Sequence, residues 1–237
     1  MGVVQIVFSP TGGTKKVADV ITSEWGQPVR TVDLSDAEAD FDSVSLEKGD
    51  VAVIAVSSFG GRVPAPAAER LKKIHGNQAF AVLVCVYGNR AYEDTLVELS
   101  DAAQESGFQV AAGIAAIAEH SIMHQYAAGR PDGEDRNELK EIAQRIKEKL
   151  ACGEEKSVSV PGNRPYKEAK AASMVPLTGD ACTGCGLCAE KCPVRAIPKE
   201  HPDRTDETRC NSCMRCVEVR PPTARKTGSE KEAGLAA

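Results

Sequence analysis

Cysteine spacing constrains this 237-residue chain more than any other feature of its sequence. Seven of the nine cysteines lie between positions 182 and 216, and the first four follow the pattern C-x-x-C-x-x-C-x-x-x-C-P. In this spacing the first three thiolates ligate one iron–sulfur cluster, and the fourth ligates a neighbouring cluster. The run is therefore predicted to bind iron through Cys182, Cys185, Cys188 and Cys192.

Structural zinc is the alternative, because paired C-x-x-C motifs also hold that metal. A zinc site takes four ligands in two pairs. Here three thiolates stand at successive steps of three, and the fourth follows four positions later, before Pro193. Seven free thiols this close together would be hard to explain in a reduced compartment unless they bind a metal. The spacing favours iron–sulfur clusters over zinc.

A second cysteine run repeats the first, and each of its members lies 28 positions after its counterpart. In two-cluster bacterial ferredoxins the fourth cysteine of each run ligates the cluster of the other run. One [4Fe-4S] cluster is thus predicted on Cys192, Cys210, Cys213 and Cys216. The other cluster would need a cysteine at position 220, where the sequence has Arg220. A guanidinium has no lone pair to offer and cannot replace a thiolate.

The cluster on Cys182, Cys185 and Cys188 therefore has incomplete cysteine ligation. Four outcomes are open: a [3Fe-4S] cluster, a [4Fe-4S] cluster with water or an added thiol, rescue by another side chain, or no cluster. Cys152 and His201 are the candidates for rescue. We expect a cluster that is present but labile or altered. An open iron corner could be a reactive site, as an open position on zinc is, but a lost ligand with no new role is the simpler interpretation.

Composition divides the chain into two domains, because the cysteine runs lie entirely in its last third. Residues 1–150 carry 15 Lys and Arg against 22 Asp and Glu, and residues 151–237 carry 14 against 12. Neither half has the basic stripe that nucleic acid requires. No apolar run is long enough for a membrane span, and no signal peptide is indicated. A cytoplasmic protein with reduced thiols is expected.

Strand and helix patterns alternate along residues 1–150. Apolar, β-branched runs predict five buried strands, at residues 3–8, 29–34, 51–56, 80–86 and 109–118. Amphipathic periodicity predicts helices at residues 15–25, from Pro64 or Pro66 onward, at 92–106 and at 138–150. Such alternation is typical of an α/β fold with a doubly wound, five-stranded parallel sheet. Cys85, inside the fourth strand, is predicted to be a small buried hydrophobic residue.

Ligands bind such sheets beyond the carboxyl ends of the strands, and three loops fall there. The first loop, residues 9–14 (SPTGGT), is a hydroxyl- and glycine-rich turn that opens a helix and suits a phosphate. It lacks the Walker lysine and G-x-G-x-x-G, so a phosphate monoester such as that of FMN is favoured over a nucleoside triphosphate or a dinucleotide. A turn that only caps the helix is the alternative.

The second and third loops are residues 57–62 (SSFGGR) and 87–94 (YGNRAYED). Aromatic residues are scarce in the chain, yet Phe59, Tyr87 and Tyr92 lie in these loops, where their rings could stack on a flat ligand. Each ring taken singly is more often part of a core. A further loop of about fifteen residues contains His120, His124 and Arg130, and its length suits either a lid or a surface loop with solvated histidines.

These features carry a family resemblance. The three loops resemble the FMN loops of the flavodoxin-like fold, and residues 160–168 (VPGNRPYKE) with the cysteine runs are similar to a fusion of that fold to a bacterial two-cluster ferredoxin. The resemblance implies a flavodoxin-like domain at 1–150, a linker at 151–173, a small α+β ferredoxin domain at 174–226 and a flexible tail at 227–237. Arg220 departs from the ferredoxin pattern.

The resemblance also implies which residues hold FMN. The phosphate would be bound by Ser9, Thr11, Gly12, Gly13 and Thr14. The ring would be lined by Ser58, Phe59, Gly60, Gly61, Tyr87, Gly88, Asn89 and Tyr92. In proteins of this fold a glycine peptide beside the flavin can turn as the flavin is reduced, which would fit the Gly60–Gly61 pair.

These cofactors predict an electron-transfer protein that links one-electron iron–sulfur centres to a flavin and exchanges electrons with a redox partner protein. No acid/base pair or nucleophile is evident in the sequence. One alternative is an FMN-dependent oxidoreductase that passes electrons from the clusters to a small acceptor such as a quinone or a nitro compound. The other is an iron–sulfur redox sensor that signals through loss of the incomplete cluster.

Overall fold

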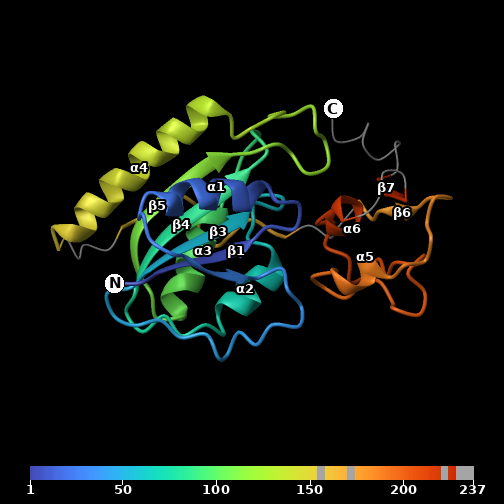
Figure 1. Ribbon diagram of the computed structural model, residues 1–237, viewed down its shortest axis with the longest axis horizontal. Coiled ribbons are helices and arrows are strands. Elements are labelled where there is room, and N and C mark those ends of the chain that lie inside the picture. Colours follow the sequence, from blue (N-terminus) through green and yellow to red (C-terminus); the bar gives the residue numbers. More distant parts are fainter. Residues whose placement is uncertain (154–157, 170–173, 220–223, 228–237) are drawn as a thin grey trace.

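The computed structural model describes residues 1–153, 158–169, 174–219 and 224–227. Two parts are visible (Figure 1): a sheet domain, residues 1–153, and a smaller cysteine-repeat domain, the described part of residues 174–227. Among these described residues, no helix is both long enough and apolar enough to cross a membrane.

The sheet domain contains five parallel strands in the order β2-β1-β3-β4-β5. The strands are β1 (Val3–Phe8), β2 (Arg30–Asp33), β3 (Val51–Ser57), β4 (Phe80–Tyr87) and β5 (Gln109–Ile117). The helices are α1 (Gly13–Ser23), α2 (Ala65–Leu71), α3 (Thr95–Glu105) and α4 (Gly133–Ala151). This strand order is the flavodoxin-like one, so the predicted fold class is confirmed.

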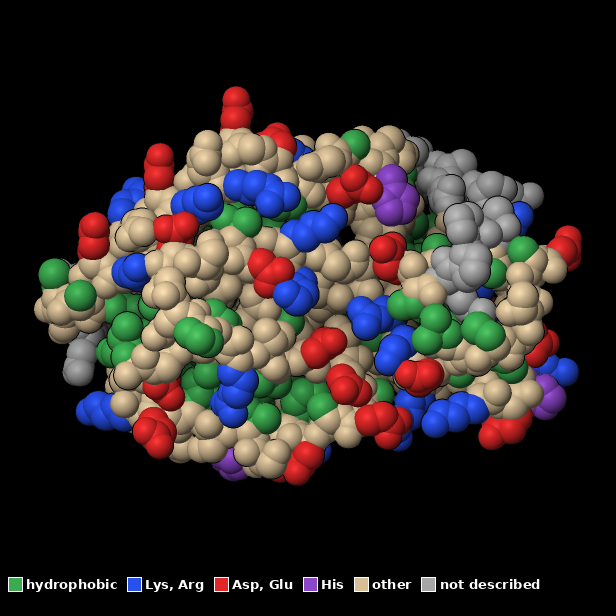
Figure 2. Space-filling view, in the orientation of Figure 1, with side chains coloured by type: hydrophobic (Ala, Val, Ile, Leu, Met, Phe, Trp, Pro, Cys, Tyr) green, Lys and Arg blue, Asp and Glu red, His purple; other side chains and the backbone are tan. Residues whose placement is uncertain are grey.

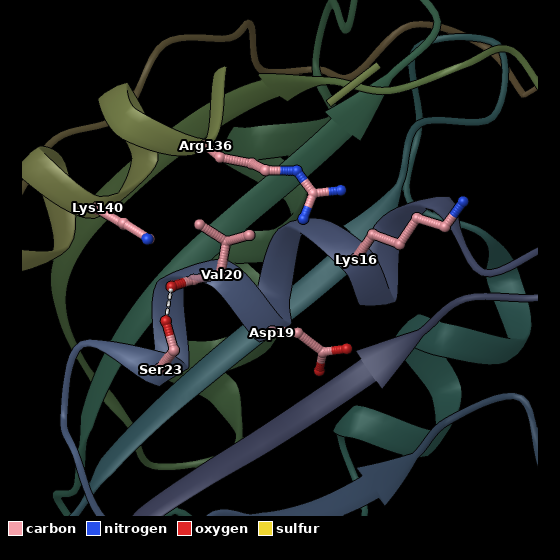
Figure 3. A pocket seen from close by; sticks show the side chains of 6 residues that line it. All are labelled: Lys16, Asp19, Val20, Ser23, Arg136 and Lys140. Atoms are coloured by element: carbon pink, nitrogen blue, oxygen red, sulfur yellow. Dashed lines mark hydrogen bonds between the residues drawn. The ribbon is translucent and has the colours of Figure 1, made fainter. Parts of the chain in front are cut away.

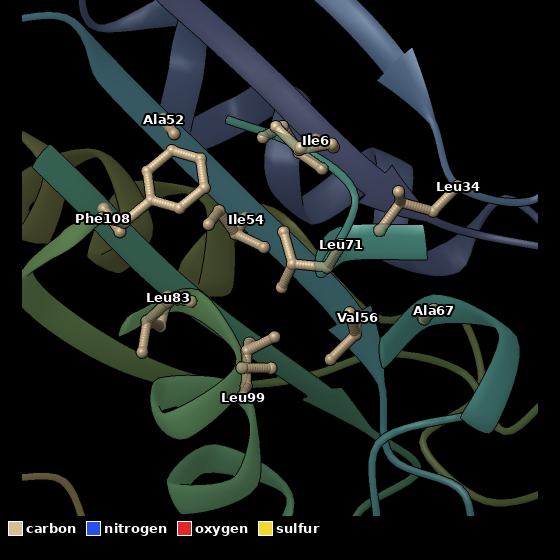
Figure 4. Packing of buried hydrophobic residues seen from close by; sticks show 14 of the residues in the cluster. Ile6, Leu34, Ala52, Ile54, Val56, Ala67, Leu71, Leu83, Leu99 and Phe108 are labelled. Carbon is tan, nitrogen blue, oxygen red and sulfur yellow. The ribbon is translucent and has the colours of Figure 1, made fainter. Parts of the chain in front are cut away.

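Both faces of the sheet are buried, which explains why its strands read as continuous apolar runs. Alternate residues of a strand point to opposite faces. On one face, side chains such as Ile6, Ile54 and Leu83 pack against Leu71 of α2 and Leu99 of α3 (Figure 4). The other face, with Val7, Val53 and Val84 among its members, packs against α1 and α4. Cys85 is fully buried in the first of these cores, as predicted.

The largest difference from the predicted boundaries is at α4, which begins five residues before the predicted start at 138. Asp132 caps this helix: its carboxylate accepts from the N–H groups of Glu134 and Asp135, and the Asp135 side chain accepts from the N–H of Asp132. A capping box satisfies N–H groups that would otherwise lack partners. The polar first turn therefore forms helix although it lacks the apolar residues on which the prediction relied.

The two cysteine runs have the same backbone form, and we call residues 182–197 the first repeat and residues 210–225 the second repeat. Their short helices are α5 (Leu187–Glu190) and α6 (Arg215–Glu218). Left-handed residues precede α5 at Gly184 (φ 70°) and Gly186 (φ 75°). The equivalent residues before α6, Ser212 (φ 55°) and Met214 (φ 61°), are also left-handed, although that region is uncommon for residues with a Cβ. The internal repeat is thus present in the backbone.

Outside the cysteine runs, a two-stranded antiparallel sheet completes the cysteine-repeat domain. It pairs β6 (Leu177–Thr178) with β7 (Arg225–Lys226). Together with α5 and α6 this gives the small α+β arrangement that was expected.

Arginines join the two domains. Arg70 of α2 donates to the carbonyls of Leu34 and Pro193, and Arg195 donates to the carbonyl of Ala37 at 2.9 Å. Basic and acidic side chains gather where the domains meet (Figure 2). The cysteine-repeat domain is therefore held at the end of the sheet where β1 and β2 terminate.

The chain between the domains is anchored to α3 where it is described. The Asp94 carboxylate accepts from the backbone N–H of Asn163 at 2.8 Å and from that of Lys167 at 2.7 Å. Val158 and Val160 pack against the core of the sheet domain. The predicted linker at 151–173 also includes residues outside the described part of the chain, and its bounds stay a prediction.

Candidate functional site

The first loop leads into α1 through a glycine, which has no side chain to cap the helix. Gly12, at φ 86°, is the N-cap of α1, and the first turn of that helix carries no acidic residue. N–H groups of a first helical turn have no intrahelical acceptors and attract anions. The Ser9 hydroxyl accepts from the N–H of Lys15 at 2.9 Å, and Thr14 is buried with its hydroxyl 3.3 Å from that of Ser57. The chemistry of this loop fits a phosphate.

The second loop turns back on itself within four residues. Phe59 and Arg62 exchange backbone hydrogen bonds of 3.0 and 3.2 Å around Gly60 (φ 60°) and Gly61 (φ 87°). A Cβ at Gly61 would lie 1.9 Å from the Glu93 carboxylate, so this glycine is required both by its backbone angle and by the close approach of the third loop. The second and third loops are therefore in direct contact.

Aromatic rings of these loops contact one another and the core. The Tyr87 and Tyr92 rings meet edge to face with centroids 5.3 Å apart, and Phe59 meets Phe8 at 6.2 Å. Phe59 packs against the core, so its ring contributes to the core, as a single aromatic ring most often does. Asn89 is exposed with φ 63°, and Ser58 shares a 2.7 Å hydrogen bond with Thr95.

All thirteen predicted FMN residues lie at one edge of the sheet, because the three loops follow the neighbouring strands β1, β3 and β4. That arrangement is where ligands of such sheets bind. Their roles as FMN ligands stay predictions.

The loop that contains His120, His124 and Arg130 is closed by hydrogen bonds of its own. The Nδ1 of His120 accepts from the N–H groups of Ile122 at 3.2 Å and Met123 at 3.1 Å, and burial lowers the pKa of this histidine. His124 lies 2.7 Å from the Glu119 carboxylate. A Cβ at Gly88 would lie 2.5 Å from the His120 ring, so this loop covers the third FMN loop.

Mutual effects on their pKa values show that the four cysteines of the predicted complete cluster lie close together. The pKa of Cys213 is raised to about 12, mainly by burial, and the charges of Cys192, Cys216 and Cys210 act in the same direction. Burial also raises the pKa of Cys216, to about 11, and that of Cys210. Four thiolates this close repel one another unless a cation is bound between them. The donor set fits an iron–sulfur cluster.

Buried donors without acceptors gather in the second repeat. Within the described residues, five buried side-chain atoms have no hydrogen-bond partner, and four of these belong to Asn211, Arg215 and Arg225. Buried polar groups are nearly always satisfied. Three of the four atoms are N–H donors, on Asn211, Arg215 and Arg225, and the sulfur atoms of a cluster would supply acceptors for them. In the same part of the chain, no three His, Cys, Asp or Glu side chains converge on one metal ion. Cluster thiolates bind separate irons and need not converge.

The first cysteine set is more open than the second. Cys188 is buried, Cys182 is half-buried and Cys185 is exposed. Of the two rescue candidates, Cys152 ends α4 at the far side of the sheet domain from the cysteine repeats (Figure 1), so it cannot complete this cluster within one chain. His201 lies on an exposed turn of the cysteine-repeat domain. Arg220 lies outside the described residues.

One arginine connects the second repeat to the first loop, which is predicted to bind the FMN phosphate. The Nη1 of Arg215 donates to the carbonyl of Pro10 at 3.0 Å and lies 3.4 Å from that of Ser9. Arg215 directly precedes Cys216 in the chain. The contact places a cluster ligand and the predicted phosphate loop on either side of a single side chain.

A shallow groove of about 350 Å³ lies elsewhere, between α1 and α4. Figure 3 shows it lined by Lys16, Asp19, Val20, Ser23, Arg136 and Lys140. The Ser23 hydroxyl is used within α1, where it donates to the carbonyl of Val20 at 2.7 Å. The groove contains none of the predicted site residues, and we assign it no role.

Sequence reasoning missed Asn211, Arg215 and Arg225. A signal was available, because the repeat is broken at two of these positions: Arg215 and Arg225 are equivalent to Leu187 and Ile197. Charged residues that replace apolar ones in one copy of a repeat indicate a difference in function or environment.

Comparison with known proteins agrees with the two parts of the chain. Residues 161–223 match the 4Fe-4S dicluster domain. A comparison with curated proteins found no match.

Solved structures align with the sheet domain. A flavodoxin from the domain Archaea is 16% identical and aligns over 64% of this chain and 99% of its own, with a TM-score of 0.45. The flavodoxin of Streptococcus pneumoniae TIGR4 is 19% identical over 62% of this chain and 99% of its own, with a TM-score of 0.45. The rubredoxin oxygen:oxidoreductase of Desulfovibrio gigas is 17% identical over 64% of this chain and 36% of its own, also at 0.45. The fold assignment rests on the strand order of the sheet.

Proposed function

We propose that this chain, which joins a flavodoxin-like domain to a 4Fe-4S dicluster domain, relays electrons between iron–sulfur clusters and FMN. The observation that carries the proposal is the contact of Arg215, beside Cys216, with the backbone of Ser9 and Pro10. Electron transfer is fastest between centres held close together, and this contact holds the second repeat against the loop predicted to bind the FMN phosphate.

The residues of each part have distinct tasks. The uncapped first turn of α1 and the hydroxyls of Ser9 and Thr14 would hold the phosphate. The second and third loops would line the flavin ring, with Gly60 and Gly61 giving the backbone a close approach. The four clustered thiols would hold one [4Fe-4S] cluster. When bound, FMN supplies a centre that accepts one or two electrons, whereas each cluster exchanges one.

Arg215 would also act on the phosphate. The first loop has no cation in the Walker position. The guanidinium of Arg215, which belongs to the cysteine-repeat domain, contacts the Pro10 carbonyl of this loop. A positive charge near a bound phosphate monoester favours its binding. Loss of this residue would weaken both the docking of the second repeat and the hold on FMN.

A rapid-mixing experiment on the anaerobically purified protein tests the relay. The oxidised protein is mixed with a limiting amount of a low-potential one-electron donor, and bleaching of the clusters and of the flavin is followed in the same sample. The relay predicts that electrons pass from clusters to flavin at a rate independent of protein concentration, and that Arg215→Gln slows this step. Arg209→Gln, an exposed change of the same charge beside Cys210, is the matched control.

A transfer rate that rises with protein concentration would contradict an intramolecular relay. Sustained turnover of a quinone or a nitro compound under the same donor would favour the oxidoreductase instead. Iron, acid-labile sulfide and FMN are measured on each sample first; about eight irons per flavin correspond to two four-iron clusters, about seven to a three-iron first cluster and about four to the second cluster alone.

A further inference from the structure

Arg225 is the most deeply buried cation in the described part of the cysteine-repeat domain. Its side chain, on β7, is 2% exposed. Nη1 donates to the Thr205 hydroxyl at 2.8 Å, and Nη2 donates to the carbonyls of Pro202 at 2.7 Å and Arg204 at 3.2 Å. β7 is paired with β6 in register Thr178↔Arg225, which fixes the backbone from which this side chain extends.

This guanidinium has no protein counter-charge in the described part of the chain. Its acceptors are neutral, and no described carboxylate forms an ion pair with it. The Nε–H of Arg225 has no partner at all. Burying an unpaired charge is costly, and proteins tolerate it where another charge or a metal compensates.

The groups that face this charge are cluster thiols. Helix α6, which carries Cys216, packs against β7, which carries Arg225. The Arg225 side chain interacts with those of Cys216 and Cys210. The guanidinium therefore lies beside two of the four cysteines predicted to hold the complete cluster.

The first repeat has an apolar side chain at the equivalent position. Ile197, 28 positions before Arg225, is 4% exposed and packs against Cys188 and Ala189. Cys188 is the counterpart of Cys216. The same place in the backbone thus presents a hydrocarbon to one cluster and a cation to the other.

We propose that Arg225 is the buried counter-charge of the cluster on Cys192, Cys210, Cys213 and Cys216 and raises its reduction potential. The inference rests on the proposed function, because it needs a cluster at this place. Net charge and hydrogen bonds to the sulfur atoms are what set such potentials. Reduction adds one negative charge to the cluster, and a nearby cation in a buried setting stabilises the reduced form more than the oxidised form.

The test is a potentiometric titration of the full-length protein, followed by the electron paramagnetic resonance signals of the reduced clusters. Arg225→Gln is expected to shift the midpoint of the cluster on Cys192, Cys210, Cys213 and Cys216 downward, and to shift that of the first cluster less, because Arg225 reaches Cys188 only through the Pro202 carbonyl that both contact. Arg225→Lys, which keeps the charge but loses the Nε–H, is expected to give a smaller downward shift. Arg209→Gln removes an exposed cation next to Cys210 and is expected to leave both midpoints unchanged.

Thr205→Val provides a second route, since it removes the hydroxyl that holds Nη1 while keeping the charge. Thr205→Val is expected to lower the midpoint potential of this cluster slightly. This variant keeps the test valid if Arg225→Gln does not assemble the cluster, which is checked by measuring iron and sulfide content. Unchanged midpoints in Arg225→Gln or, where that variant lacks the cluster, in Thr205→Val would overturn the inference. Equal shifts in Arg225→Gln and Arg209→Gln would do the same. A parent protein with no four-iron cluster would instead overturn the proposed function.

Discussion

The two cysteine repeats have the same backbone form at the positions described in both, but their surroundings differ. Gly186 and Met214 are both left-handed and begin equivalent short helices, and Ala196 and Ala224 are both 1% exposed. Around this shared frame, Leu187 of the first repeat is replaced by an arginine that reaches the sheet domain. A repeat can therefore preserve the geometry that holds a cluster while each copy sets its own electrostatics and contacts.

The difference also extends to ligand supply. Cys192 of the first repeat is predicted to complete the second set of cysteines. The equivalent position in the second repeat is Arg220, so the first set lacks a fourth cysteine. Three observations then separate the sets: the second is complete in cysteines, lies beside the buried Arg225, and belongs to the repeat whose Arg215 contacts the first loop. We expect the second cluster to be the stable centre next to the flavin, and the first to be the labile one.

The largest expected effect comes from making the second set resemble the first. Cys192→Ala leaves three cysteines for the second cluster, so we expect the loss of about one to four irons per chain, depending on whether a three-iron cluster forms. Iron and acid-labile sulfide measure the loss. Cys152→Ala, outside both runs, is the control and should retain the parent's content; a Cys192→Ala protein that also retains it would show that the sets are assigned wrongly.

The reverse change completes the first set. Arg220→Cys supplies the thiolate that the ferredoxin pattern expects, and we predict that the first cluster then survives several-fold longer in air, because its open iron corner is closed. Decay of the visible cluster absorbance in aerated buffer gives the lifetimes. Equal lifetimes and equal iron content in parent and variant would mean that position 220 is not a ligand position.

The smallest expected effect concerns the segment that leads to the first repeat. N–H donors of Lys167 and Asn163 hold the pKa of Asp94 below its usual range. Because the folded pKa is the lower one, the ionised carboxylate stabilises this docked segment above the unfolded pKa of about 3.9, and the contribution is lost as the pH falls through the folded value. At neutral pH, Asp94→Asn should mimic that loss and speed amide exchange of residues 163–167 a few-fold.

Hydrogen-exchange mass spectrometry reads this change, and Asp19→Asn on the exposed face of α1 is the matched control. Iron content of the two clusters in the same sample sharpens the comparison of the repeats. Loosening this segment should disturb the first cluster before the second, because the segment leads directly into the first repeat. Equal loss of both clusters would mean that the two repeats depend equally on this segment.

The sequence by itself determined the features that depend on local pattern. Continuous apolar runs give strands that are buried on both faces, such as Val3–Phe8, and their predicted bounds were close to those observed. The cysteine spacing indicated two cluster sets because three of the four ligands of each such cluster are near neighbours in the chain. The three loops were located because loops of a parallel sheet necessarily meet beyond the carboxyl ends of adjacent strands.

Only the tertiary structure determined which distant parts of the chain are in contact. Arg215 contacts Pro10 across 205 positions, and Arg225 meets Cys216 after the chain has folded back into β7. No local pattern records such contacts, because an arginine in sequence looks the same whether it is solvated or buried. Its environment is set by which elements pack together, and packing depends on the whole chain's burial of apolar surface rather than on the residues beside it.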